Sequence, residues 1–195
     1  GAWILWLGWF GFNGGSELKV SEVSSATAVS QVFLNTNLAA AGGVLAAMFM
    51  SLAVTGKMDV TMAINGAIAG LVSITADPLS PSAGTAVIVG AIGGAIVYAS
   101  IVFLEKAGID DPVGAISAHG TVGIWGVLVV SLTGGASFGG QLIGVLMIAG
   151  FTYLASLGTI LAINKFVMPI RASDAEQEAG LDISEVGIEA YPEFK

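Results

Sequence analysis

The sequence predicts an all-α, polytopic transmembrane helix bundle with about six membrane spans. Hydrophobic residues make up 55% of the 195 residues and charged residues only 10%, whereas a soluble domain carries about 25% charged residues. The mean hydropathy is +0.88, and the apolar residues gather in runs long enough to cross a bilayer. Because so few charges could not cover a surface that faces water, we expect the helices to lie in lipid.

Six apolar runs are separated by short polar stretches. The first is short and opens without Met or a charged leader, so we expect the sequence to come from a longer protein. The second is long enough to tilt or to extend beyond the bilayer, and each later run is close to the roughly 20 residues that a span needs. The predicted spans cover residues 1–16, 26–54, 60–76, 83–104, 112–132 and 138–167.

The charges divide the chain into two parts. Residues 1–169 form the predicted transmembrane helical domain, a partial one, and residues 170–195 form an acidic tail that holds seven of the 14 acidic residues. Lys19 is the only basic residue on one side of the predicted bundle, and the other loops and the tail carry Lys57, Lys106, Lys165 and Arg171. Because basic residues gather in cytoplasmic loops, we expect the tail in the cytoplasm.

The only histidine, His119, lies seven residues into the fifth predicted span, which is about 10 Å deep at 1.5 Å per residue. An ionisable side chain at that depth is costly and usually faces a cavity or a partner. A neutral imidazole donates at one ring nitrogen and accepts at the other, which suits a pore for a small hydrogen-bonding molecule. A hydrogen bond between helices, with no pathway, is the alternative, and the position alone leaves both open.

Aromatic and hydroxyl side chains share one face of the first predicted span. Trp9 and Phe12 are three residues apart, and Ser16 follows one turn later, nearer the outer surface. Aromatic faces can bind a cation, and a hydroxyl oxygen can accept a hydrogen bond from it. An ordinary interfacial aromatic belt would have the same composition.

Other polar and small residues have structural interpretations. Asp110 and Asp111, followed by Pro112, are expected to cap the fifth helix, because carboxylates favour a helix N-terminus and Pro suits the first turn. Asn35, Asn37 and Asn65 lie within apolar spans, so we expect them to be buried and to hydrogen-bond between helices. Glycines four residues apart predict close helix packing, at Gly66 and Gly70, Gly90 and Gly94, and Gly140 and Gly144.

Four motifs, in order along nearly the whole chain, resemble the ammonium transporter family (Amt/MEP, distantly related to Rhesus proteins). They are GWFGFNGGS at 8–16, NGAIAGLV at 65–72 followed by Thr75, DDP at 110–112 followed by His119 and by GIWG at 123–126, and GLD at 180–182 followed by EAY at 189–191. The chain departs from the pattern at Gly114, where some members carry Asp, and at Val186, where relatives commonly carry His.

The resemblance implies half of an eleven-helix inverted-repeat channel, with spans similar to the sixth to eleventh helices. It also implies a homotrimer with one pore per subunit. By this likeness His119 is the second of two pore histidines, Phe12 is one of two stacked gate phenylalanines, and Trp9 lines the conduction path. Ser16 would belong to the outer ammonium recruitment site. The other half, with the first pore histidine, is absent from this sequence.

The implied function is a multi-pass channel of the plasma membrane that recruits ammonium, or its analogue methylammonium, and conducts ammonia. The tail residues Gly180, Leu181, Asp182 and Tyr191 would be regulatory and could bind a P-II signal protein. An ammonium sensor that signals through the tail is the alternative. An aquaporin-like channel is disfavoured because the paired Asn-Pro-Ala motifs are missing, and we expect no enzyme activity, no cofactor and, without Cys, no thiolate metal site.

Overall fold

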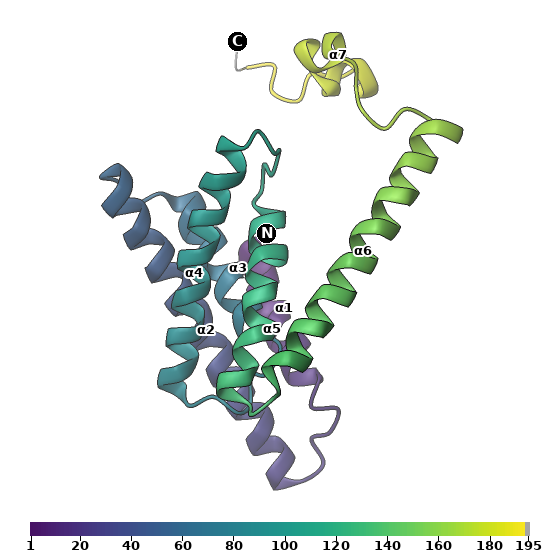
Figure 1. The fold of residues 1–195 in the computed structure, drawn as a ribbon. Coiled ribbons are helices and arrows are strands. Elements are labelled where there is room, and N and C mark those ends of the chain that lie inside the picture. Colours follow the sequence, from purple (N-terminus) through teal and green to yellow (C-terminus); the bar gives the residue numbers. More distant parts are fainter. Residues whose placement is uncertain (194–195) are drawn as a thin grey trace. The chain divides into compact units, whose positions relative to one another are not determined.

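A computed structural model describes residues 1–193 of the chain. Within this range every regular element is helical, and Figure 1 shows their arrangement. The elements are α1 (Ala2–Gly15), α2 (Val23–Thr55), α3 (Val60–Ile74), α4 (Ala83–Lys106), η1 (Ile116–Thr121), α5 (Val122–Thr133), α6 (Phe138–Phe166), α7 (Asp174–Ala179) and η2 (Asp182–Val186), of which η1 and η2 are π-helical. The chain divides into two compact units, Gly1–Val145 and Leu146–Lys195.

The predicted helical membrane bundle is confirmed, although its helices differ in length. Four described helices are long and apolar enough to cross a membrane, namely α2, η1 with α5, α4 and α6. Helix α3 has 15 residues and is about 22 Å long, less than the roughly 30 Å of a bilayer core. It begins abruptly because the Asp59 side chain accepts hydrogen bonds from the amides of Thr61 and Met62. Helix α1 is also short, with 14 residues.

Glycines let α2, α3 and α4 pack backbone against backbone (Figure 1). A Cβ atom on Gly66 would collide with the carbonyl oxygen of Gly43, and one on Gly90 would collide with that of Ala39. The close packing predicted for the glycine pairs of α3 and α4 is therefore confirmed. On α6 it is not seen, since a Cβ on Gly144 would have no neighbour within 4 Å among the described residues.

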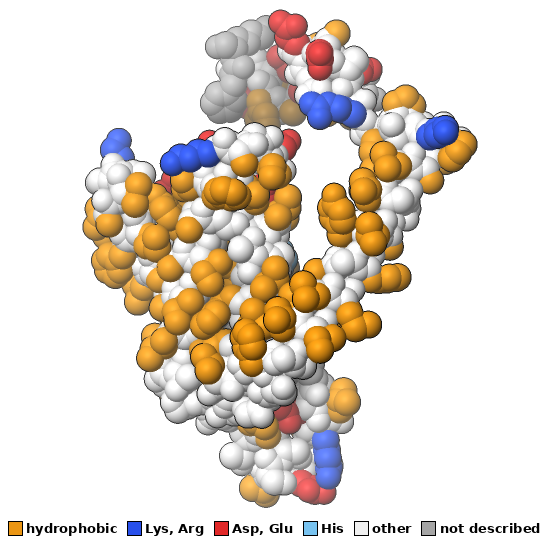
Figure 2. All heavy atoms as spheres, in the orientation of Figure 1, with side chains coloured by type: hydrophobic (Ala, Val, Ile, Leu, Met, Phe, Trp, Pro, Cys, Tyr) orange, Lys and Arg blue, Asp and Glu red, His pale blue; other side chains and the backbone are white. Residues whose placement is uncertain are grey.

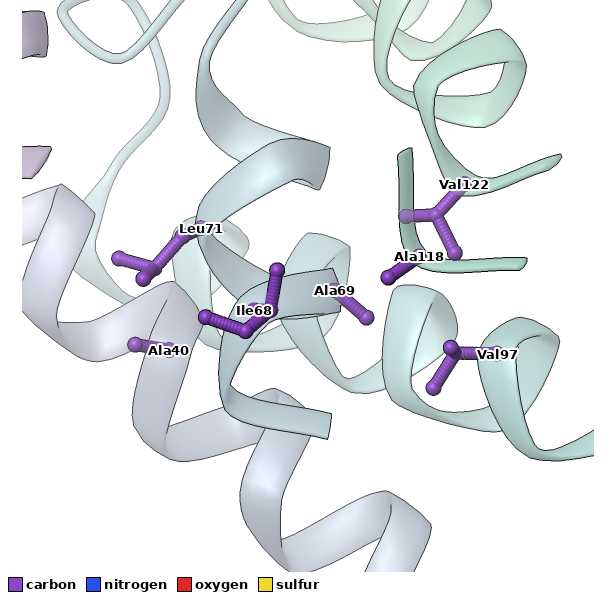
Figure 3. Close-up of a cluster of buried hydrophobic side chains, with 7 residues drawn as sticks. All are labelled: Ala40, Ile68, Ala69, Leu71, Val97, Ala118 and Val122. Atoms are coloured by element: carbon purple, nitrogen blue, oxygen red, sulfur yellow. The ribbon is translucent and has the colours of Figure 1, made fainter. Parts of the chain in front are cut away.

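A cluster of small and branched side chains joins the helices of the first unit. Figure 3 shows the cluster, which consists of Ala40, Ile68, Ala69, Leu71, Val97, Ala118 and Val122. Ala118 is only 2% exposed and directly precedes His119 in η1. The η1 turn is thus anchored in the core through the neighbour of the histidine.

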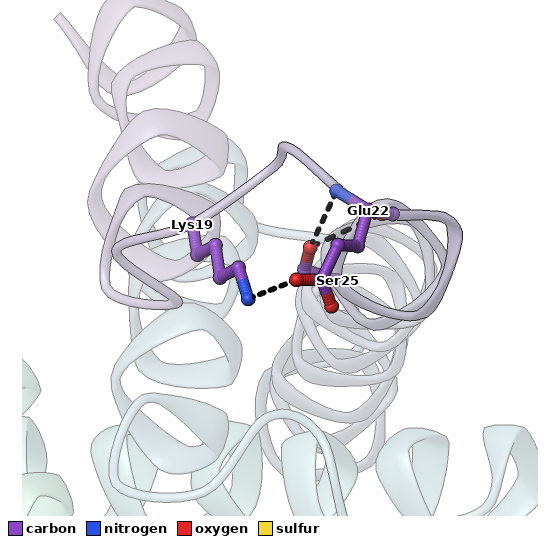
Figure 4. A network of polar contacts seen from close by, with 3 residues as sticks. All are labelled: Lys19, Glu22 and Ser25. Atoms are coloured by element: carbon purple, nitrogen blue, oxygen red, sulfur yellow. Dashed lines mark hydrogen bonds and ion pairs between the residues drawn. The ribbon is translucent and has the colours of Figure 1, made fainter.

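The two ends of the first unit differ in their number of basic residues. Helices α2 and α4 end on the same side in Figure 1, next to Lys57 and Lys106. Figure 2 shows basic side chains at the ends of the bundle and apolar side chains between them. At the other end, Lys19 pairs with Glu22 at 2.6 Å, and Glu22 also forms a capping box with Ser25 at the start of α2 (Figure 4). This unit therefore has two basic residues at one end, Lys57 and Lys106, and one at the other, Lys19.

The second unit contains the tail. Ser173 caps α7 in a reciprocal capping box with Glu176. The Asp182 carboxylate then accepts hydrogen bonds from the amides of Ala190, at 2.7 Å, and Ile183, at 3.0 Å. These bonds fold residues 182–190 into a closed loop.

We expect Gly90→Ala to destabilise the first unit by about 1–3 kcal/mol, because the added methyl group has no room against the backbone of α2. The measurement is thermal unfolding of the purified protein in detergent. Gly84→Ala is the control on the same helix, since a Cβ at Gly84 meets nothing within 4 Å. Equal unfolding temperatures for the two variants would contradict this account of the packing.

Candidate conduction site

Four pockets follow one another through the first unit and share lining residues. The Ser16 pocket, of about 380 Å³, shares Thr75 and Ala76 with the Trp9 pocket, of about 360 Å³. The Trp9 pocket shares His119 with the Asn65 pocket, of about 410 Å³. The last is the Asp111 pocket, of about 340 Å³, which shares Asn65 and Gly114 with the Asn65 pocket.

His119 lines both middle pockets, so its ring lies where the two meet. The ring stacks on the Trp9 indole with centroids 6.3 Å apart and planes 13° apart. Within the described part of the chain neither ring nitrogen has a hydrogen-bond partner, so both remain available to a ligand. The alternative of a hydrogen bond between helices is not seen there.

Trp9 is itself held in place. Its indole N–H donates to Thr75 Oγ1 at 2.8 Å, and the Thr75 hydroxyl donates to the carbonyl of Leu71 at 2.6 Å. Thr75 sits just after α3 and lines the two pockets on that side of His119. The end of α3 thus orients the Trp9 ring, which lines the Trp9 pocket.

Phe12 and Ser16 lie together at the α1 end of the series. Both line the Ser16 pocket, and the Phe12 ring meets Trp9 edge to face with centroids 6.1 Å apart. The Ser16 hydroxyl donates to the Phe12 carbonyl at 2.7 Å, which leaves its oxygen lone pairs free to accept. Carboxylates of Glu17 and Asp77 line the same pocket, so its charge favours a cation.

The opposite end of the series is also acidic. Glu105, Asp110 and Asp111 line the Asp111 pocket. Gly114 adopts a φ of +70° there, a conformation that side-chain-bearing residues rarely adopt. A Cβ on Gly114 would also press on the Asn65 amide oxygen, 2.6 Å away. The departure from Asp at this position therefore leaves room for Asn65 where two pockets meet.

Asp111 holds the turn that carries His119. Its carboxylate accepts hydrogen bonds from the amides of Ile116, at 2.9 Å, and Ser117, at 3.1 Å. Partial burial acts to raise the pKa of the Asp111 carboxyl, but these hydrogen bonds outweigh it, and the pKa lies below its ordinary value. The predicted capping is confirmed for Asp111, whereas Asp110 makes no hydrogen bond to any described residue.

The turn itself is π-helical. Such turns occur mostly as single insertions in α-helices, frequently at functional sites. At its other end the Thr121 hydroxyl is 3.0 Å from that of Ser100 on α4. Core packing, the Asp111 cap and this contact hold the His119 ring against Trp9.

The structure brings four predicted site residues, Trp9, Phe12, Ser16 and His119, into one connected series of pockets. Sequence reasoning did not assign Thr75 a contact with Trp9, and it gave Asn13 no role. Asn37 is exposed in this chain rather than buried as expected. In the described range, Asn65 does not bond between helices as expected, because its amide donates to the Thr61 carbonyl of its own helix at 3.1 Å. The tail residues Gly180, Leu181, Asp182 and Tyr191 lie in the second unit, in or next to the closed loop.

Comparison with known proteins gives a consistent result. The model of the Ammonium Transporter Family matches residues 1–191. The chain is 40% identical to Ammonium transporter Amt2 of Archaeoglobus fulgidus, covering 100% of this chain and 45% of the relative. It is 32% identical to the ammonium transporter of Bacillus subtilis, and the match covers 98% of this chain and 50% of the relative. The chain thus spans about half the length of the curated relatives it matches.

Solved structures agree with the sequence relatives. A structure described as Sensor Amt Protein superposes with a TM-score of 0.86 at 32% identity, covering 94% of this chain and 47% of that one. Mep2 of Candida albicans superposes with a TM-score of 0.80 at 29% identity, and the match covers 90% of this chain and 42% of Mep2.

We expect Asp111→Ala to lower the stability of the first unit by about 1 kcal/mol at neutral pH, as loss of a helix cap does. Because folding depresses the pKa of Asp111, its contribution is complete above the unfolded value of 3.8 and is lost as pH falls through the folded value. The unfolding temperatures of wild type and variant should therefore converge in acid. Asp110→Ala is the control and should match wild type throughout. A difference between wild type and Asp111→Ala that does not shrink in acid would contradict the cap.

Proposed function

The chain belongs to the ammonium transporter family, and we propose that it lines one side of the conduction path of an ammonium transporter. The observation that carries this proposal is the series of pockets that passes His119 between two acidic ends. The transporter recruits ammonium at the Ser16 end and conducts ammonia along the histidine.

Energetics favours passage of the neutral base. Moving an intact ion into an apolar passage costs tens of kcal/mol in the Born limit. Ammonium has a pKa roughly two units above neutrality, so its deprotonation at pH 7 costs only about 3 kcal/mol. Potassium has no proton to lose, and selectivity against it follows from the same comparison.

Each site residue has a role in this mechanism. The rings of Trp9 and Phe12 and the hydroxyl oxygen of Ser16 attract and hold the cation. The apolar wall of the Trp9 pocket, formed by residues such as Val72 and Val127, disfavours the charge. The unpaired nitrogens of His119 then replace water as hydrogen-bond partners for ammonia.

We further propose that the rest of the transporter closes this path. Phe12 is 62% exposed and His119 is also exposed in this chain, so one side of the path is uncovered here. A second half of similar length, with its own pore histidine, would cover it, and three such subunits would form a homotrimer. Residues 1–169 would lie in the plasma membrane and residues 170–195 in the cytoplasm.

The tail is proposed to regulate transport. The closed loop held by Asp182 presents acidic and apolar side chains, and Tyr191 follows it directly. The backbone hydrogen bonds to the Asp182 carboxylate, that of the Ala190 amide foremost, lower the pKa of this carboxyl. The carboxylate thus stays charged and the loop closed at neutral pH. A P-II signal protein is the proposed partner. An ammonium sensor is the second candidate function, and the similarity to the structure described as Sensor Amt Protein favours it.

In the full-length transporter we expect His119→Ala to lower methylammonium uptake at least tenfold, because ammonia loses its hydrogen-bond partner in the apolar path. Uptake of labelled methylammonium by cells that lack other ammonium transporters is the measurement. Leu132→Ala, which removes an exposed side chain at the far end of α5, should transport like wild type. Unchanged uptake and selectivity in His119→Ala would refute the proposed path.

We expect Asp182→Ala to have the same effect on regulation as deletion of residues 172–195, because both destroy the closed loop. The measurements are uptake and co-purification of a P-II protein with the full-length transporter. Glu178→Ala is the control, since Glu178 is exposed outside the loop. If the deletion changes neither uptake nor co-purification, the regulatory role is wrong. A deletion that abolishes a signal but spares uptake would favour the sensor.

A further inference from the structure

Asn13 carries a buried hydrogen-bond acceptor without a partner. The residue is only 3% exposed, and its amide nitrogen donates to Thr36 Oγ1 at 3.0 Å. Its carbonyl oxygen Oδ1 is buried and has no hydrogen-bond partner among residues 1–193. Such an atom destabilises a protein by about 1–3 kcal/mol, so its presence calls for a reason.

A second buried amide side chain, that of Asn35, has a structural role and serves as a comparison for Asn13. Asn35 is fully buried, and its nitrogen donates to the carbonyls of Pro78 and Pro81 at 2.9 and 2.7 Å. Its oxygen accepts a hydrogen bond from Gln31 at 3.1 Å. Asn35 therefore ties α2 to the loop before α4 with every polar atom used, whereas Asn13 keeps its acceptor free.

The place of Asn13 suggests what the free acceptor is for. Asn13 follows Phe12 directly and lines the Ser16 pocket with Phe12 and Ser16. The carboxylates of Glu17 and Asp77 on the same pocket attract a cation, and an ion that enters must exchange water for other acceptors. A carbonyl oxygen is a suitable acceptor for an N–H group. Because Thr36 holds the nitrogen, the oxygen is the atom of this amide that is left to bind a ligand.

We propose that Asn13 Oδ1 is a binding group for ammonium. This oxygen accepts a hydrogen bond from an N–H group of the ion as the ion leaves Ser16 and loses water. This inference rests on the proposed function and adds a residue to its entrance. Because the oxygen is buried, binding requires the surrounding side chains to move and open it to an ion in the pocket. An N–H donor of the ion would satisfy this acceptor.

Asn13→Leu in the full-length transporter tests the proposal, because it removes the acceptor at similar volume. We expect the methylammonium concentration for half-maximal uptake to rise about tenfold. We also expect ammonium chloride, compared with potassium chloride, to raise the unfolding temperature of wild type but not of this variant. Asn35→Leu is the matched control and should lower the unfolding temperature in either salt.

The outcomes separate the two proposals. A wild-type protein that fails to take up methylammonium but shows an ammonium-specific shift, lost in Asn13→Leu, would support the binding group and refute the transport function. Wild-type uptake that Asn13→Leu leaves unchanged, together with an intact shift, would overturn the binding group alone. A loss of stability in Asn13→Leu equal to that in Asn35→Leu would also overturn it, since Asn13 would then be structural. No shift and no uptake in wild type would overturn both.

Discussion

The placement of one imidazole ring depends on the turn that carries it. The η1 turn is held from below by Ala118 in the core, at its start by the Asp111 carboxylate, and at its end by the contact between Thr121 and Ser100. Core packing in turn requires the glycines of α2, α3 and α4, which bring three backbones together. Rigid placement matters for the proposed path, in which ammonia passes the His119 ring and bonds to nitrogens that the protein leaves free.

Polar groups along the path differ in whether the protein already satisfies them. Thr75 and Trp9 use their hydrogen-bonding atoms within the fold and so act as supports. His119 and Asn13 do not, and both border the same series of pockets. In an apolar surrounding an unpaired polar atom is costly, and a transported molecule that donates and accepts hydrogen bonds relieves that cost during passage. In the proposed mechanism, the apolar walls between these atoms disfavour a charged molecule.

Much of this could be predicted from the sequence, because it depends on local patterns. Apolar runs marked the helices, glycine spacing marked the close contacts of α3 and α4, and the position before Pro112 marked the cap at Asp111. What could not be predicted depends on distant partners. The π-helical turn, the bond from Trp9 to Thr75 and the free oxygen of Asn13 arise only when helices meet, and no spacing signals them. Asn37, in turn, was expected to be buried because its span is apolar, but it lies on an exposed face.

The central claim is that the path admits the neutral base and excludes ions. The most direct measurement compares ammonium with rubidium, an ion of similar size that has no proton to lose, in liposomes that contain the full-length transporter. The account predicts rapid ammonium uptake with rubidium flux no greater than in empty liposomes. Rubidium flux at a rate comparable to that of ammonium would contradict it, because an intact cation would then be crossing beside His119.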